Sequence, residues 1–400
     1  MTVTPQSPEL RRELGLGDAV VTGLGAMLGA GIFVTLAPTA GAAGSGLLIA
    51  LAIAAVVAYC NANSSARLAA KYPSAGGTYV YGRERLGMFW GYLAGWGFVV
   101  GKTASCAAMA LTAVNYVGIQ KSAWVIRLLV AVVLIVLVSV VVAVAASPDV
   151  DAARLDATSG LSATGLLEAA GLWFFAFAGY ARIATLGEEV RDPVRTISRA
   201  ITIALAVVVV IYALVAVGAL AVMGADALSD SNAPLVDVVR AADAPALVPV
   251  VTIGAALAAL GALLTLILGV SRTTLAMARD GNLPRALAAV HPRFHVPHRA
   301  EVVVGIVVAV LAATFDVRDA IGFSAFAVLI YYAIANLSAL TLEGPREWWR
   351  KAVPVAGLIG CLVLGFSLPA TSVIAGVGVL AIGAALYWLR LLRRRSTADH

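Results

Sequence analysis

The chain has 400 residues, of which 61% are hydrophobic and only 12% are charged, and its formal net charge is +6. An ordinary soluble domain carries roughly 25% charged residues, and a chain this apolar could not cover a water-facing surface. The composition therefore excludes a soluble protein and indicates an integral membrane protein.

Apolar runs separated by charged residues, glycine and proline predict a series of transmembrane helices. A bilayer crossing needs roughly 18–20 apolar residues, and most of the runs reach that length. In chain order the predicted spans are 17–37, 45–66, 86–116, 122–146, 165–187, 199–223, 247–277, 300–315, 319–341, 352–368 and 371–391. The polar stretch 1–16 is predicted to be a tail rather than a cleaved signal, and 392–400 a second, basic tail.

Basic and acidic residues occupy alternating connections between these spans. The stretches 67–85, 191–199 and 272–299 are rich in basic residues, whereas 149–156 and 226–243 are chiefly acidic. By the positive-inside rule the basic connections are cytoplasmic, and the N-terminus lies with them. The positive charge is therefore a topology signal, and we expect no nucleic-acid partner.

The alternation fails once. The connections that contain 83–85 and 191–199 are both basic, yet three predicted spans separate them where an even number is required. The run 86–116 is too short to cross twice at a rise of about 1.5 Å per residue. Either one hydrophobic run does not span the membrane, or a span is missing from this chain.

Two spans are predicted to break near mid-membrane. The first contains Gly-Ala-Gly-Ile-Phe at 29–33, and the fifth contains Phe-Ala-Gly-Tyr at 177–180 after an aromatic run. Glycine lets the backbone leave helical geometry, and a bilayer tolerates unpaired backbone only where protein or a water-filled cavity receives it. Two interrupted helices, each early in its half of the chain, indicate an inverted-repeat transporter with a midplane site. Close helix packing and aromatic core packing are the alternatives.

Four stretches taken together resemble the amino acid–polyamine–organocation (APC) transporter superfamily. They are 29–33, the Lys-Tyr-Pro-Ser-Ala-Gly-Gly-Thr-Tyr-Val-Tyr run at 71–81, 177–180 with Glu-Glu-Val-Arg-Asp-Pro at 188–193, and Ala-Met-Ala-Arg-Asp-Gly-Asn-Leu-Pro at 276–284. The resemblance implies an all-α membrane fold with a five-plus-five inverted repeat, two broken helices and two accessory C-terminal helices. It also implies alternating access around a central site.

This chain departs from that pattern in its first repeat. Within a membrane domain at 17–391, the resemblance places the first repeat at 17–146, the second at 165–341 and the accessory helices at 352–391. The first repeat then holds four spans, because the family's fourth helix is missing between its third and fifth. That gap falls where the charge alternation fails. A partner chain that supplies the helix, an inverted span or a defective gene product would each account for it.

The resemblance also implies a set of substrate contacts. The substrate carboxylate would bind backbone amides at the first break, and its ammonium would bind carbonyls at the second, where a tyrosine occludes the pocket. The predicted substrate-binding residues are Gly29, Ala30, Gly31, Ile32, Phe177, Ala178, Gly179, Tyr180 and Lys102. Lys102 is considered next.

Two charges lie inside predicted spans. Lys102 is about 16 residues into its helix, or roughly 24 Å along it, and the resemblance places it near the side-chain pocket. It could attract an acidic substrate group, act as a proton-linked ammonium or pair with a carboxylate; snorkelling to the outer interface is the alternative. Arg182 is predicted to close the inner vestibule through a salt bridge with Asp18 or Glu188, and snorkelling is again the alternative.

These features predict a secondary transporter of the cell membrane for amino acids or related amines, coupled to protons or exchanging substrates. We expect no cofactor and no metal. A non-transporting substrate sensor or assembly subunit is the alternative, because one helix is missing. A membrane enzyme is not indicated, since the sequence has no arrangement of catalytic residues or metal-ligand motif typical of one.

Overall fold

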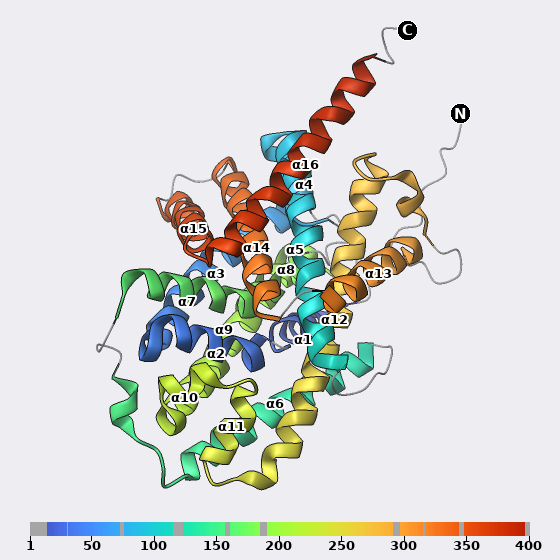
Figure 1. The fold of residues 1–400 in the computed structure, drawn as a ribbon. Coiled ribbons are helices and arrows are strands. Elements are labelled where there is room, and N and C mark those ends of the chain that lie inside the picture. Colours follow the sequence, from blue (N-terminus) through green and yellow to red (C-terminus); the bar gives the residue numbers. More distant parts are fainter. Residues whose placement is uncertain are drawn as a thin grey trace.

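The computed structural model describes residues 14–29, 31–72, 76–114, 123–156, 161–184, 190–290, 297–314, 317–343 and 348–396. Within these ranges the chain is helical apart from turns and one isolated β-bridge between Leu14 and Val190. Eight helical segments of the described chain are long and apolar enough to cross a membrane. The predicted all-α membrane fold is confirmed (Figure 1).

The helices occur in the following order. They are α1 (Leu16–Met27), α2 (Gly31–Ala43), α3 (Leu47–Lys71), α4 (Thr78–Leu86), α5 (Met88–Val114), α6 (Ala123–Ala146), α7 (Ala163–Phe177), α8 (Ala181–Ala184), α9 (Pro193–Met223), α10 (Ala225–Asp230), α11 (Pro234–Ala241), α12 (Val248–Arg279), α13 (His298–Thr314), α14 (Val317–Leu340), α15 (Trp349–Phe366) and α16 (Ala370–Ser396). Short 3-10 turns are η1 (Gly44–Gly46), η2 (Ala152–Leu155), η3 (Ala178–Tyr180), η4 (Pro245–Leu247) and η5 (Arg285–Ala288).

Several helices extend beyond their predicted ends. α9 begins at Pro193, six residues before the predicted start at 199, and α16 continues to Ser396 past the predicted end at 391. Proline suits the first turn of a helix because its missing N–H would have no partner there. The apolar runs mark where a helix meets lipid, whereas the backbone hydrogen bonds can continue into the polar region on either side.

α5 lies at the centre of the bundle and packs closely on α14. A Cβ atom on Gly101 would lie 2.5 Å from the Cβ of Ala327, so only glycine allows this approach. One turn further on, Ser105 and Ser324 share a buried hydrogen bond between their hydroxyls. Small residues that let two backbones approach, together with a polar contact, are typical of helix pairs in membranes.

α5 and α6 follow one another in the chain and run in the same direction. α6 is antiparallel to α12, since Gly254 packs on Val136 and Gly261 packs on Leu129. α5 starts beside the end of α12 and is therefore antiparallel to it as well (Figure 1). Consecutive spanning helices normally alternate in direction, and only the eight residues 115–122 separate these two.

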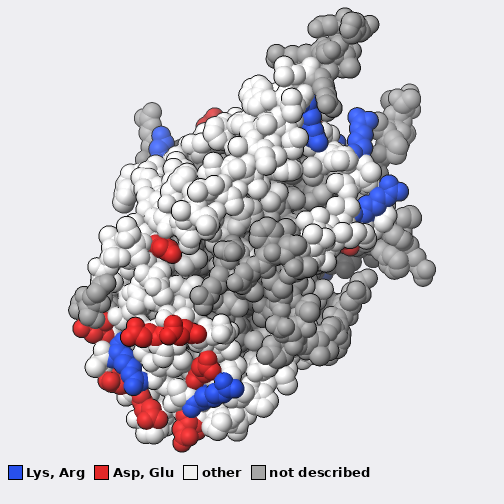
Figure 2. Space-filling model, in the orientation of Figure 1, with Lys and Arg blue, Asp and Glu red and all other residues white. Residues whose placement is uncertain are grey.

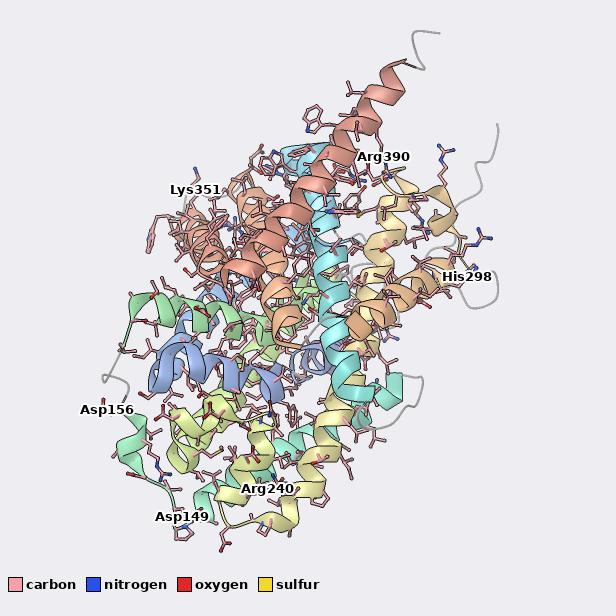
Figure 3. The ribbon with its side chains drawn as sticks, viewed as in Figure 1. Asp149, Asp156, Arg240, His298, Lys351 and Arg390 are labelled. Carbon is pink, nitrogen blue, oxygen red and sulfur yellow. The ribbon has the colours of Figure 1, made fainter. Side chains whose placement is uncertain are left out.

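Charged residues gather at two opposite ends of the molecule. Asp149, Asp156 and Arg240 lie at one end, and Lys351 and Arg390 lie at the other (Figure 3). Acidic side chains crowd the first end, around α10 and α11, whereas basic side chains dominate the second on the face in view (Figure 2). We call these the acidic end and the basic end. The assignment of the basic end to the cytoplasm remains a prediction.

At the basic end, two of the motifs that carry the family resemblance meet. Tyr79 and Arg83 of α4 both donate hydrogen bonds to Asp280, which follows α12. Asn282 donates its side-chain amide to the Tyr79 hydroxyl at 2.9 Å, and Arg390 of α16 donates to the Asn282 carbonyl. Burial, aided by the bond to Asp280, raises the pKa of Tyr79 far above its usual value, so the phenol remains a donor at all physiological pH.

The separation of the two ends predicts labelling from opposite sides of the membrane. The native cysteines Cys60, Cys106 and Cys361 are buried, and serine can replace them to give a background free of thiols. In intact cells, a membrane-impermeant maleimide should label Asp149→Cys, whereas Lys351→Cys should react only after permeabilisation. Labelling of both cysteines from one side would contradict the assignment.

Candidate functional site

Both predicted helix breaks are present. α1 ends at Met27 and α2 begins at Gly31, while α7 ends at Phe177 and continues through η3 into α8. Ala30 lies outside the described residues. The other residues predicted to bind the substrate backbone are all buried inside the bundle.

The two breaks touch each other directly. A Cβ atom on Gly31 would lie 2.8 Å from the Cα of Ala176, and one on Gly179 would collide with the carbonyl of Ala26. Real side chains do not approach so closely, so both contacts require glycine. The structure therefore places the first and second breaks, some 150 residues apart in sequence, against each other.

The breaks expose backbone groups of opposite polarity to one interior region. The first amides of α2, beginning at Gly31, have no carbonyl partner within their helix, and they form its positive end. α1 and α7 end at the same level, where their last carbonyls form negative helix ends. A zwitterion whose carboxylate meets the amides and whose ammonium meets the carbonyls matches this arrangement.

Tyr212 of α9 connects both breaks and was missed by the sequence analysis. Its hydroxyl donates to the carbonyl of Met27 and also lies 3.3 Å from the carbonyl of Ala176. Its ring packs against Trp173 and Phe177, with centroid distances of 6.0 and 5.3 Å. A signal was available, because this tyrosine is the only aromatic residue in its predicted span.

Tyr180, at the second break, is buried beside a polar cluster. Its ring stacks on Tyr332 with a centroid distance of 4.9 Å. Within the cluster, the Asn336 side-chain amide donates to Asn61 at 2.6 Å, and the Cys361 thiol lies 3.3 Å from the same Asn61 oxygen. The break is thereby joined to α3, α14 and α15 as well as to the helices that carry it.

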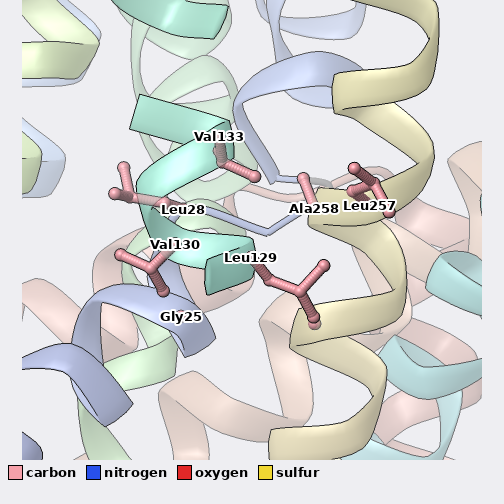
Figure 4. A pocket seen from close by; sticks show the side chains of 8 residues that line it. Gly25, Leu28, Leu129, Val130, Val133, Leu257 and Ala258 are labelled. Carbon is pink, nitrogen blue, oxygen red and sulfur yellow. The ribbon is translucent and has the colours of Figure 1, made fainter. Parts of the chain in front are cut away.

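A small apolar gap adjoins the first break (Figure 4). It has a volume of about 10 Å³, which is at most the space that one water occupies. Its walls come from α1, α6 and α12, through Gly25, Leu28, Leu129, Val130, Val133, Leu257, Ala258 and Gly261. In this conformation the gap is too small for an amino acid, and its lining offers no side-chain hydrogen bond.

Lys102 is buried in α5 with 3% of its surface exposed, which argues against snorkelling to an interface. Cys106, one helical turn further on, is the titratable group that lies close to its ammonium. None of the ion pairs between described residues includes Lys102. A cation buried in this way is costly in a membrane protein and by default marks a functional position.

The predicted gate is only partly visible. Asp18 forms an ion pair with Arg127 of α6, and its carboxylate also accepts the backbone N–H of Gly15 at 3.1 Å. This pair forms because α6 lies directly beside the start of α1. Arg182 is buried next to Gly269 of α12, and Glu188 lies outside the described residues.

A bundle of apolar helices in which two interrupted helices meet is the arrangement expected of a membrane transporter. The sequence comparisons agree with the geometry. One family model described as amino acid permease matches residues 103–391, and a second with the same description matches residues 18–150. The chain belongs to the amino acid permease family of the APC superfamily.

Several transporters are similar to this chain over nearly its full length. An uncharacterized transporter of Mycobacterium tuberculosis is 64% identical, with 97% of this chain and 93% of the relative covered. A branched-chain amino acid permease of Bacillus subtilis is 27% identical, covering 97% and 95%. A methylthioribose transporter of the same species is 24% identical, again covering 97% and 95%.

Removing the Tyr212 hydroxyl should destabilise the protein. Tyr212→Phe keeps the ring contacts but leaves two buried carbonyls without their donor, at an expected cost of about 1–3 kcal/mol. Thermal unfolding of the purified protein in detergent measures the loss. Tyr59→Phe is the matched control, because Tyr59 is half exposed on α3. Equal unfolding temperatures for the two variants would show that the Tyr212 hydroxyl does not hold the breaks together.

Proposed function

We propose that this permease-family protein is a secondary active transporter of the cell membrane with a cytoplasmic N-terminus. It moves amino acids or related amines by alternating access, coupled to protons or in exchange for a second substrate. The observation that carries the proposal is the direct contact between the two helix breaks, at Gly31 and Ala176 and at Gly179 and Ala26.

The substrate backbone binds across that contact. Its carboxylate accepts hydrogen bonds from the amides of Ala30, Gly31 and Ile32, and its ammonium donates to carbonyls near Phe177 and Ala178. In the present conformation this region is packed shut, so the two half-helix pairs separate to admit a substrate. Tyr180 then lies over the bound molecule.

Lys102 supplies the charge at the side-chain end of the site. Its burial without an ion-pair partner among the described residues supports a role in which a substrate carboxylate completes the pair. A proton-linked ammonium is the second candidate, because a buried amine that releases its proton would remove the same uncompensated charge.

The missing fourth helix remains part of the proposal. It is supported by the shared direction of α5 and α6, since the eight residues 115–122 reach at most about 28 Å when extended, while the bilayer core is about 30 Å thick. It is also supported by alignment length. The alignment with the Mycobacterium tuberculosis transporter has 411 positions, more than the 400 residues of this chain, so the relative contains residues that this chain lacks.

A substrate sensor or assembly subunit is the second candidate function, and the same missing helix favours it. A first repeat of four helices cannot mirror a second repeat of five, which removes the symmetry that alternating access uses. A protein of this kind would bind its substrate at the breaks without moving it across the membrane.

Uptake into proteoliposomes separates the two functions. A panel of labelled amino acids should give saturable uptake of at least one member, and Gly31→Val should abolish it because the new side chain collides with Ala176. Gly378→Val on α16 is the control, since a Cβ there meets no atom within 4 Å. Substrate binding without uptake would refute transport and favour the sensor. Uptake that survives Gly31→Val would show that the breaks are not the site.

Replacing Lys102 tests its role in selectivity. Lys102→Met keeps the length of the side chain and removes its charge, and uptake or binding of acidic substrates should fall about tenfold or more, which is the usual strength of a charge-assisted hydrogen bond. Neutral substrates should be much less affected. Lys71→Met, at the exposed end of α3, is the matched control. Equal losses for acidic and neutral substrates would contradict a charge-selective role.

A further inference from the structure

A second pocket, which is partly polar, lies between α3 and α9. It has a volume of about 90 Å³, roughly six or more times what one water needs. Its polar lining is Asn63 and Arg67 from α3 with Ser198 and Thr202 from α9, and its apolar lining is Tyr59, Ala62, Ala66 and Leu205. The pocket is therefore large enough for a phosphate group and is rich in hydrogen-bonding groups.

The pocket lies close to the basic end of both helices. Arg67 is four residues before the end of α3, and Ser198 is five residues after the start of α9, so both lie within about 8 Å of a helix end. Trp348 and Trp349 directly precede Arg350, whose carbonyl accepts the Arg67 hydrogen bond, and both are exposed, Trp348 by 81%. Exposed tryptophans at a helix end are typical of the level of lipid headgroups.

Arg67 lines the pocket and contacts the backbone of a second arginine. It donates to the backbone carbonyl of Arg350 at 2.8 Å, and the Arg350 guanidinium lies 5.8 Å from the ring of Trp349. The Nε atoms of both arginines are buried and make no hydrogen bond. In the described part of the chain, no carboxylate forms an ion pair with either arginine.

The Arg67 guanidinium favours an anion in the pocket. A group with several negative oxygens can accept hydrogen bonds from its free donors and balance its charge. The Asn63 oxygen is buried without a partner, and rotation of its amide by half a turn would present the N–H₂ to the same ligand. The Ser198 hydroxyl can donate from the α9 side, whereas the Thr202 hydroxyl donates to the Ser198 carbonyl at 3.1 Å.

The surroundings indicate that this anion belongs to a lipid. Below the polar lining, α3 exposes Val56 and Tyr59, and α9 exposes Ile203 and Val210. These exposed apolar side chains lie further from the basic end than Arg67 and Ser198 on the same two helices. A soluble anion would make no contact with these apolar side chains, whereas the acyl chains of a phospholipid would pack along them.

We propose that the pocket between α3 and α9 binds the phosphate of an anionic phospholipid from the leaflet at the basic end. Arg67 holds the phosphate, the Ser198 hydroxyl and the rotated Asn63 amide donate to its oxygens, and the acyl chains lie against the apolar faces of the two helices. The site is separate from the helix breaks, and its existence does not depend on whether the chain transports a substrate.

Lipid binding to the purified full-length protein tests the proposal. Native mass spectrometry in nonionic detergent should show phosphatidylglycerol bound more tightly than phosphatidylcholine. Arg67→Gln should weaken phosphatidylglycerol binding about fivefold or more, because each basic side chain at a membrane surface contributes roughly 1 kcal/mol. Arg195→Gln is the matched control on the same end of α9, since Arg195 is exposed and does not line the pocket.

A second variant covers the case in which Arg67→Gln does not fold. Thr202→Leu fills the pocket from an exposed position on α9 without removing a charge, and it should weaken phosphatidylglycerol binding while the unfolding temperature stays near that of the wild type. Equal binding by wild type and Thr202→Leu would overturn the proposal. So would equal binding of the two lipids, or displacement of phosphatidylglycerol by millimolar inorganic phosphate, which would identify a site for a soluble anion.

Discussion

The other helices are arranged around the contact between the two helix breaks. Gly31 lies against Ala176 and Gly179 against Ala26, and neither position has room for a side chain. Each half-helix that ends there leaves amides or carbonyls that its own helix cannot satisfy. Inside a bilayer those groups need partners from the protein or from a bound molecule, so the surrounding helices close around them.

α9 connects this central contact with the surface of the bundle. Tyr212, near its middle, donates its hydroxyl to the ends of both α1 and α7, so a movement at either break changes a bond that α9 makes. Closer to its start, Ser198 and Thr202 line the pocket next to Arg67. α9 therefore runs from the contact between the helix breaks to the pocket at the basic end.

Much of this architecture could be predicted from local features of the chain. The helix breaks follow from the glycine steps at 29–31 and 179, because the freedom of a glycine backbone is a property of that residue alone. The helix ends were less predictable, as α9 shows by starting at Pro193. Tyr212 could not be assigned a role, since the carbonyl of Met27 that it meets lies 185 residues away along the chain.

Hydrophobic runs and glycine positions alone were enough to establish the membrane class, the order of the helices and the presence of two breaks. The hydrophobicity of a run and the backbone flexibility of its glycines are properties of that segment alone. They do not depend on which other segments pack against it. Only the folded bundle decided that the breaks touch, that Asp18 pairs with Arg127 and that α5 and α6 run in the same direction. Those outcomes depend on how helices distant in sequence pack together, and side-chain contacts across the bundle set that packing.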